Sequence, residues 1–266
     1  MTNDAKKYCY AQVAKPGGAF YYSLRKLTAE KRDALVAVHA LYREITDTLF
    51  SSQEPNVTIA KFAWWRNEVM RDQFDHPVLI FLKQFNLPKE NLLAMIDGIA
   101  ESLHPAPFAT FEDVVIHLMR SAGNRELLLT QKSSAEIVYQ LMLVIELTHY
   151  LQHLRFYLQH NVVYFPADEL VKFNVTLSML NQLKMTPQIK NLLLYQIEKI
   201  ERAYQAAKSA LRSDERVELS SLIIRAEMAK VLLKEIQRSD FSMFDQVISL
   251  TPIKHWWIAF RCWPIN

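Results

Sequence analysis

Apolar residues recur every three or four positions along almost the whole chain, and this spacing is the strongest constraint on its fold. One such stripe consists of Leu35, Val38, Leu41, Tyr42, Ile45 and Leu49. Only four glycines occur in 266 residues, fewer than sheets joined by tight hairpins usually need. No run alternates like a strand, and no linker rich in Gly, Ser or Pro divides the chain. The sequence therefore predicts an all-α protein with one domain over residues 1–266.

Capping and breaking signals place the expected helices. Thr28 or a neighbour caps the first stripe, Gln53–Asn56 breaks the chain, and Thr110 opens a capping box with Asp113. Further helices are expected over about 58–70, 78–84, 89–101, 110–129, 134–160, 186–213, 217–236 and 253–263, with a loop at 105–107 and an extended segment at 161–165. The most apolar run, Ile137–Ile145, is far shorter than the roughly 20 residues that span a bilayer. It predicts a buried helix.

Charge and cysteine usage exclude some functions and favour one compartment. The formal net charge is only +3 and basic residues alternate with acidic ones, which argues against a nucleic-acid partner. No Gly-rich phosphate loop or Ser-His-Asp pattern is present. The polar start, Met1–Lys7, has no apolar signal-peptide core, and Cys9 and Cys262 are interpreted as reduced thiols. The expected location is cytoplasmic.

Three segments resemble motifs of one enzyme family. The first combines Phe20–Leu27, Lys31–Arg32 and Tyr42–Asp47, the second is Ala63–Val69, and the third is Val163–Leu170. In this order and spacing they resemble the squalene/phytoene synthase family, the head-to-head prenyl-diphosphate synthases. Weaker likenesses are Ala122–Gly123, where the family has Ala-Gly-Thr-Val-Gly, and Phe244–Val247 with Lys254. The resemblance implies a single-domain isoprenoid synthase bundle of helices around a deep central cavity.

The chemistry of that family depends on paired carboxylates. Mg²⁺ ions bridge the substrate diphosphate to aspartates on two facing helices, and carboxylates four residues apart lie on one helical face. By the resemblance, Thr46 and Phe50 stand at the two metal-facing positions of the first helix, and His153 and Tyr157 stand at those of the second. Neutral side chains do not hold Mg²⁺ as carboxylates do. We therefore expect the ordinary synthase mechanism to be disabled.

The resemblance also names candidate site residues. The expected substrate-binding residues are Phe20, Tyr21, Arg43, Glu44, His117, Glu146 and His149, the catalytic candidates are Asp47, Arg43 and Tyr164, and the metal candidates are Asp47 and His153. His149 and His153, with His160 beyond them, could also form a replacement metal site, although ordinary cavity-lining histidines are the preferred interpretation. Asp47 and Arg43 retain anion or metal binding, or they form a structural ion pair.

Two functional hypotheses follow. The preferred one is a catalytically degenerate member that binds a prenyl lipid or a protein partner, as in the family's non-catalytic branch linked to respiratory complex I assembly. The alternative is an active enzyme, either a prenyltransferase or a prenyl-diphosphate hydrolase, that uses Mg²⁺ at a reduced site built on Arg43, Asp47 and Tyr164.

Aromatic and basic residues crowd the C-terminal segment. They are Trp256, Trp257, Ile258, Phe260 and Trp263, with Lys254 and Arg261. Such a mixture suits either a helix that caps the bundle or a peripheral contact at the inner surface of a membrane. Capping is the preferred interpretation.

Overall fold

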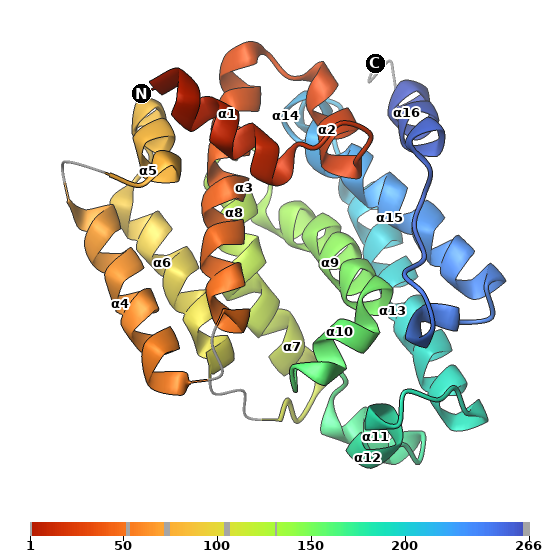
Figure 1. The fold of residues 1–266 in the computed structure, drawn as a ribbon. Coiled ribbons are helices and arrows are strands. Elements are labelled where there is room, and N and C mark those ends of the chain that lie inside the picture. The colour runs from red at the N-terminus through yellow and green to blue at the C-terminus, as the bar shows by residue number, and fades with distance from the viewer. Residues whose placement is uncertain (1, 52–53, 72–74, 104–106, 131, 263–266) are drawn as a thin grey trace.

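The computed structural model describes residues 2–51, 54–71, 75–103, 107–130 and 132–262, and in these ranges it contains helices and no strand (Figure 1). The first half of the chain forms α1 (Thr2–Val13), α2 (Ala19–Ser23), η1 (Leu24–Lys26), α3 (Ala29–Phe50), α4 (Pro55–Met70), α5 (Pro77–Leu82), η2 (Lys83–Phe85), α6 (Lys89–Ala100) and η3 (Glu101–Leu103). These helices share one apolar core around the long helix α3, which packs against α1, α4, α5 and α6.

The second half of the chain forms a larger core. Its helices are α7 (Phe111–Leu118), the π-helical turn η4 (Met119–Gly123), α8 (Asn124–Leu127), α9 (Ala135–Gln152), α10 (Leu154–Gln159), α11 (Ala167–Lys172), α12 (Leu177–Asn181), α13 (Pro187–Ala210), α14 (Glu215–Glu218), α15 (Ser220–Arg238), η5 (Ser242–Phe244) and α16 (Pro252–Arg261). Helix α9 packs against both α13 and α15 at the centre of this half (Figure 1). The expected all-α, single-domain bundle is confirmed.

Burial explains the position of α9. Residues Ile137 and Val138, and Leu141 to Val144, are all buried, so apolar side chains cover most sides of the first half of the helix. A helix with so wide an apolar surface is stable only when neighbours cover most of it. The predicted buried helix over 137–145 is therefore confirmed, and none of the helices in the described part of the chain is long and apolar enough to cross a membrane.

Two of the expected caps are confirmed. Thr28 Oγ1 accepts the amide of Lys31 at 3.4 Å at the start of α3. Thr110 and Asp113 form both halves of the capping box at the start of α7. Pro55 is the first residue of α4 rather than part of a break, because proline at this position has no amide to leave unpaired. Gln53, the loop residues 105–106 and Trp263 lie outside the described residues.

The prediction of one helix over 134–160 was wrong. His153 has φ −109° and ψ 24°, outside the helical region, and separates α9 from α10. The sequence prediction also missed α1, whose only buried residues, Ala5 and Cys9, carry too little apolar pattern to indicate a helix. Helix α1 nevertheless packs along α3 and α5.

Candidate functional site

The C-terminal end of α3 lies against α10, as the comparison of motifs predicts. The ring of Phe50 on α3 lies 5.1 Å from Phe156, 6.4 Å from Tyr157 and 5.1 Å from His160, measured between ring centroids. Phe50 and Tyr157 are two of the four positions at which the resemblance expects metal-binding carboxylates. An aromatic cluster therefore occupies this part of the helix interface.

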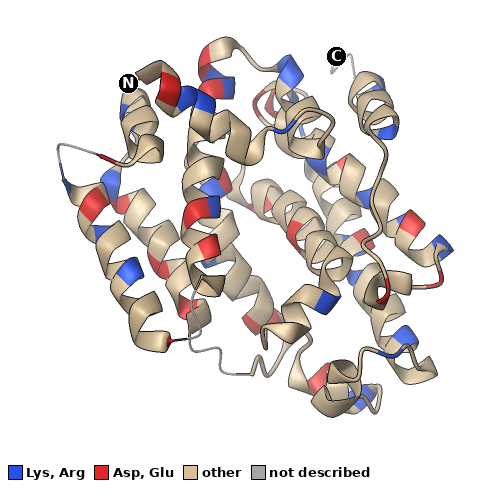
Figure 2. Cartoon of the chain, viewed as in Figure 1, with Lys and Arg blue, Asp and Glu red and all other residues tan. Residues whose placement is uncertain are grey.

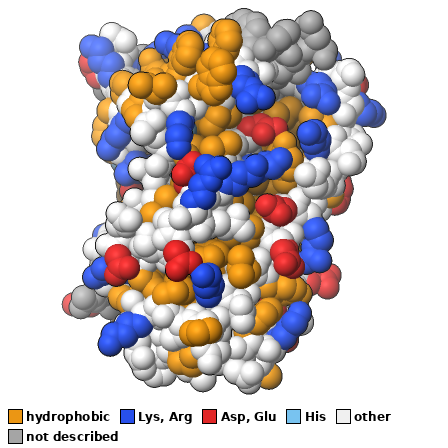
Figure 3. All heavy atoms as spheres, turned by 90° about the vertical axis from the view of Figure 1, so that its right-hand side faces the viewer, with side chains coloured by type: hydrophobic (Ala, Val, Ile, Leu, Met, Phe, Trp, Pro, Cys, Tyr) orange, Lys and Arg blue, Asp and Glu red, His pale blue; other side chains and the backbone are white. Residues whose placement is uncertain are grey.

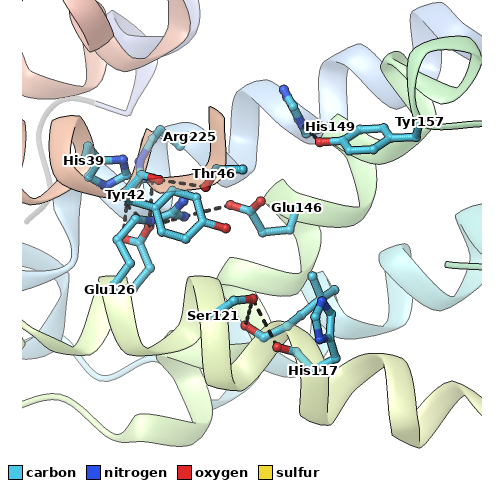
Figure 4. Close-up of polar contacts among 12 residues, drawn as sticks. His39, Tyr42, Thr46, His117, Ser121, Glu126, Glu146, His149, Tyr157 and Arg225 are labelled. Atoms are coloured by element: carbon cyan, nitrogen blue, oxygen red, sulfur yellow. Dashed lines mark hydrogen bonds and ion pairs between the residues drawn. The ribbon is translucent and has the colours of Figure 1, made fainter. Parts of the chain in front are cut away.

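Thr46 and His153, the other two positions where the resemblance expects carboxylates, also contact neighbouring side chains or backbone. Thr46 Oγ1 donates to the carbonyl of Tyr42 on its own helix at 2.7 Å. The rings of His149 and His153 lie 4.6 Å apart, and Tyr157 Oη is 3.3 Å from His149 Nδ1 (Figure 4). Desolvation and the neighbouring His149 lower the pKa of His153 to about 4, and desolvation by the surrounding protein lowers that of His149. Both imidazoles are therefore neutral at pH 7.

These side chains do not fit Mg²⁺. The ion prefers several charged or carbonyl oxygen ligands in a near-octahedral arrangement. The four positions offer one hydroxyl, one phenyl ring, one imidazole and a phenol whose pKa burial raises well above 10. No group of three or more His, Cys, Asp or Glu residues in the described ranges could hold a metal ion.

Asp47 and Arg43 form an ion pair with each other at the surface. Arg43 Nε lies 3.4 Å from Asp47 Oδ2, and the two side chains are 45% and 63% exposed. Arg43 also donates to the carbonyl of Gln12 at 2.6 Å, at the end of α1. Glu44 accepts the Tyr8 hydroxyl, also from α1, at 2.5 Å. These contacts turn Arg43 and Glu44 toward α1, and Asp47 pairs with Arg43 on its own helix.

A network of buried charges lies between α3, α8, α9 and α15. Arg225 donates both Nη groups to the carboxylate of Glu126, at 2.6 and 3.0 Å. Arg125 bridges two carboxylates, with Nη2 2.6 Å from Glu126 Oε1 and 2.7 Å from Glu146 Oε1. Figure 4 shows Glu146 pointing toward this group from α9, beside Tyr42. Two guanidinium groups and two carboxylates thus neutralise one another inside the bundle.

The network fixes the charge of its members. Burial alone would raise the pKa of Glu126, but the guanidinium groups of Arg225 and Arg125 hold it well below its usual range. His39 Nε2 lies 3.5 Å from Glu126 without a hydrogen bond, and burial together with Arg125 lowers its pKa well below 6.5. His39 is therefore a neutral neighbour of the network. The guanidinium of Arg125 lies 4.3 Å from the centre of the Tyr42 ring, which adds a cation–π contact.

The remaining predicted residues divide between the interior and the surface. Phe20 packs inside, with its ring 4.4 Å from that of His39. His117 is buried with Nε2 3.2 Å from Ser102 Oγ, and its ring lies 5.8 Å from that of Tyr164. Tyr21 instead lines a pocket beside α1. The predicted substrate-binding residues are therefore not one cluster.

A cavity of about 500 Å³ opens beside the charge network. Its apolar lining consists of Leu27, Ala34, Leu35, Phe85, Leu87, Leu128, Leu129, Leu219 and Leu222. Glu126 and Arg225 of the network also line it, as do Lys31 and Glu218. We call it the leucine cavity. Its volume is within the range of small-molecule sites, about 300–1,000 Å³.

A comparison with known families agrees with the motifs. The sequence profile described as squalene/phytoene synthase matches residues 13–256, which is most of the chain. The chain belongs to the squalene/phytoene synthase family.

Curated relatives of the family are phytoene synthases. The chain is 28% identical over 171 residues to the phytoene synthases of Mycobacterium tuberculosis and Mycobacterium bovis, a match that covers 60% of this chain and 57% of those proteins. It is 22% identical over 273 residues to the phytoene synthase of Arthrospira platensis, covering 92% of this chain and 87% of the relative. The chain thus spans somewhat more than half the length of the mycobacterial relatives it matches.

Solved structures share the fold. A dehydrosqualene synthase in complex with ligand superposes with a TM-score of 0.83 and 17% identity, over 98% of this chain and 96% of that chain. A squalene synthase from Alicyclobacillus acidocaldarius gives 0.71 and 16% identity, over 90% and 95% of the two chains. At these identities the likeness concerns the helical architecture.

The charge network is the feature that the sequence reasoning missed. Ala122–Gly123 was matched to the family's Ala-Gly-Thr-Val-Gly, and the next residues here are Asn124, Arg125 and Glu126. Arg125 and Glu126 stand where the squalene/phytoene synthase family has valine and glycine. Two charged residues at such apolar positions could have indicated a buried charge network. The partner Arg225 carried none, because it is 99 residues away from Glu126 in the chain.

Proposed function

We propose that this member of the squalene/phytoene synthase family does not condense prenyl diphosphates and instead binds a prenyl lipid in the leucine cavity. The aromatic contact between Phe50 and Tyr157 supports the first half most directly, because it fills two positions that the family's chemistry assigns to carboxylates. A diphosphate leaves readily only when cations neutralise its charge. The side chains at these positions supply no ligand set for such cations.

The leucine cavity supports the second half of the proposal. Leucine, phenylalanine and alanine make up nine of its eighteen lining residues, and an unbranched or isoprenoid chain is recognised mainly by removing such surfaces from water. Glu126 and Arg225 at the same wall offer hydrogen-bond partners for one polar end group. A polyisoprenoid alcohol, such as farnesol, has this combination of an apolar body and one polar end.

Turnover and binding are tested separately. Purified protein incubated with farnesyl or geranylgeranyl diphosphate and Mg²⁺ is expected to release neither condensed product nor phosphate above the buffer level. Native mass spectrometry is expected to detect a one-to-one complex with farnesol. The replacement Leu129→Trp fills the cavity and should weaken farnesol binding by about tenfold or more, since loss of about 1.4 kcal/mol has this effect.

Leu194→Trp is the matched control, because Leu194 is an exposed leucine on α13 outside the cavity lining. Equal binding by Leu129→Trp and the wild type would refute the cavity as the lipid site. Failure of the wild type to bind farnesol would favour the other non-catalytic role, a protein partner of the kind an assembly factor has.

An active enzyme with a reduced Mg²⁺ site is the rival proposal. It is favoured by the retained Arg43–Asp47 pair, which is accessible at the surface. Condensed product or released phosphate that disappears in Asp47→Ala would establish this activity and contradict the degenerate function. A homologue with intact aspartate motifs is the positive control for the assay.

We also propose that α16 contacts an anionic membrane surface. The helix packs on α2 and α15 through Ala259 and the half-buried Ile258, so it does cap the bundle. Its opposite side leaves Trp256, Trp257 and Phe260 between 43% and 55% exposed, and Ile253 77% exposed. Figure 3 shows hydrophobic side chains gathered at the upper end of this face, where α16 lies, with Lys and Arg side chains nearby. Such a helix suits the lipid headgroup region.

The combined replacement Trp256→Ser, Trp257→Ser and Phe260→Ser tests the contact with the membrane. It should abolish flotation with vesicles that contain phosphatidylglycerol, because each aromatic ring loses its burial in the interface. Ile59→Ser, Val171→Ser and Val217→Ser form the control, since they remove three exposed apolar residues elsewhere. Flotation that is equal in both variants and the wild type would remove α16 as an anchor.

A further inference from the structure

A second pocket lies between α1, α2 and the start of α3, and four of its eight lining residues are lysine or arginine. It has a volume of about 500 Å³ and is lined by Asn3, Lys6, Lys7, Tyr10, Tyr21, Leu24, Arg25 and Arg32. No Asp or Glu belongs to this lining. We call it the basic pocket. We propose that the basic pocket binds a phosphate-type anion, such as a diphosphate or a phosphate ester.

Three of the four cations lack a carboxylate partner in the described part of the chain. Lys7, Arg25 and Arg32 have no ion pair there, and Arg32 Nε is buried without a hydrogen-bond acceptor. Arg25 only approaches the rings of Tyr21 and Tyr22, each at 5.7 Å. Like charges that share a wall repel one another, so an anion that enters the pocket relieves this repulsion.

The fourth cation, Lys6, has a carboxylate partner, so part of the positive charge around the pocket is compensated. Lys6 Nζ lies 2.5 Å from Asp33 Oδ2, and the Tyr10 hydroxyl donates to Asp33 Oδ1 at the same distance. Burial and this hydrogen bond raise the pKa of Tyr10 to about 12, so the phenol stays neutral and adds no negative charge. Figure 2 shows Lys and Arg positions of α1 at this upper end of the molecule, with acidic positions beside them. One carboxylate therefore compensates one of the four cations.

The residue types favour phosphate over a carboxylic acid or an apolar ligand. Two arginines present planar groups of N–H donors that match the oxygens of a phosphate, and two lysines supply mobile point charges. Three uncompensated positive charges suit a ligand with two or more negative charges. Leu24 is the single aliphatic residue of the lining, and the other apolar surface belongs to tyrosine rings and to the hydrocarbon stems of lysine and arginine side chains.

The basic pocket is separate from the proposed lipid function. Arg32 precedes Phe50 by 18 positions on α3, which corresponds to about 27 Å along a helix. The leucine cavity shares no lining residue with the basic pocket. Leu129→Trp should therefore leave anion binding unchanged, and failure of one proposal does not affect the other.

Calorimetric titration of the full chain with inorganic pyrophosphate tests the proposal. The double replacement Lys7→Gln and Arg25→Gln should weaken pyrophosphate binding by about tenfold or more, because it removes two charge-assisted contacts. Lys184→Gln with Lys208→Gln is the control, since these exposed residues lie outside the pocket and the change in net charge is the same. Arg32→Gln is a second test at the deeper wall.

Vesicles distinguish the source of the phosphate group. Binding of free pyrophosphate that depends on Lys7 and Arg25 indicates a soluble phosphate ligand. Sedimentation with vesicles that contain phosphatidic acid is measured in the combined variant Trp256→Ser, Trp257→Ser and Phe260→Ser, so that α16 does not contribute. Sedimentation that Lys7→Gln and Arg25→Gln abolish, without pyrophosphate binding, indicates a lipid headgroup, and both results support the site. The proposal is overturned if neither probe binds, or if the Lys184 and Lys208 control loses binding equally.

Discussion

Replacing Glu126 by alanine should lower the free energy of unfolding by about 3–5 kcal/mol, the usual effect of breaking a buried ion pair from one side. The Glu126 side chain is 3% exposed and accepts hydrogen bonds from both Arg125 and Arg225. After the replacement Arg125 retains Glu146, but Arg225 loses its only carboxylate partner in the described ranges. A guanidinium group would then remain buried without compensation. Chemical denaturation followed by circular dichroism measures the effect.

Asp47→Ala is the control for this prediction. It also removes one carboxylate from an Arg–acid pair, but both side chains of that pair are largely exposed. Exposed pairs contribute about 0–1 kcal/mol, so the unfolding midpoint should hardly move. A combined replacement of Glu126, Arg125 and Arg225 by Leu, Met and Met removes the charges together. Adding Glu146→Gln to this combination removes the fourth charge, which would otherwise lose its partner Arg125. The quadruple variant should be less destabilising than Glu126→Ala, because no charge of the network is left without a partner.

Equal stability of Glu126→Ala and the wild type would mean that water reaches the network and solvates Arg225. The network would then be a solvated lining of the leucine cavity rather than a buried structural element.

Gly98→Ala is expected to destabilise the protein by about 3 kcal/mol or more, the upper range for overpacking. Gly98 lies in α6, which packs against the π-helical turn η4. A Cβ atom at this position would lie 2.1 Å from the carbonyl oxygen of Arg120 and 2.8 Å from the amide of Ser121. Both are backbone atoms, so one of the two elements must move. The helix propensity of alanine, about 1 kcal/mol better than that of glycine, does not offset this.

Ala94→Gly in the same helix provides the control. Ala94 is exposed, so this replacement changes propensity without affecting contacts and should cost about 1 kcal/mol. Thermal unfolding of both variants decides the question. A Gly98→Ala protein as stable as the wild type would show that α6 and η4 can separate without loss.

Sequence reasoning was most successful where a local pattern determines the structure. The caps at Thr28 and Thr110 depend on hydrogen bonds to a residue three positions ahead, and both are present. The apolar run 137–145 indicated the buried helix α9 because eight of its nine residues are hydrophobic and most sides of the helix need cover from water. Sequence reasoning failed at His153, where the chain leaves the helical region although the local pattern continues. Tertiary packing, which no short window of sequence contains, overrides helix propensity there.

The sequence by itself determined the helical class and the family, and the resemblance places Thr46, Phe50, His153 and Tyr157 where the family has aspartates. Only the tertiary structure decided which of these side chains meet. Phe50 and Tyr157 are far apart in the sequence, and the packing of α3 against α10 brings them together. The tertiary structure also placed Asp47 at the surface and joined Glu126 to Arg225. The physical reason is that spacing along one helix fixes only which side chains share a face, whereas burial and charge compensation depend on what other helices place against it.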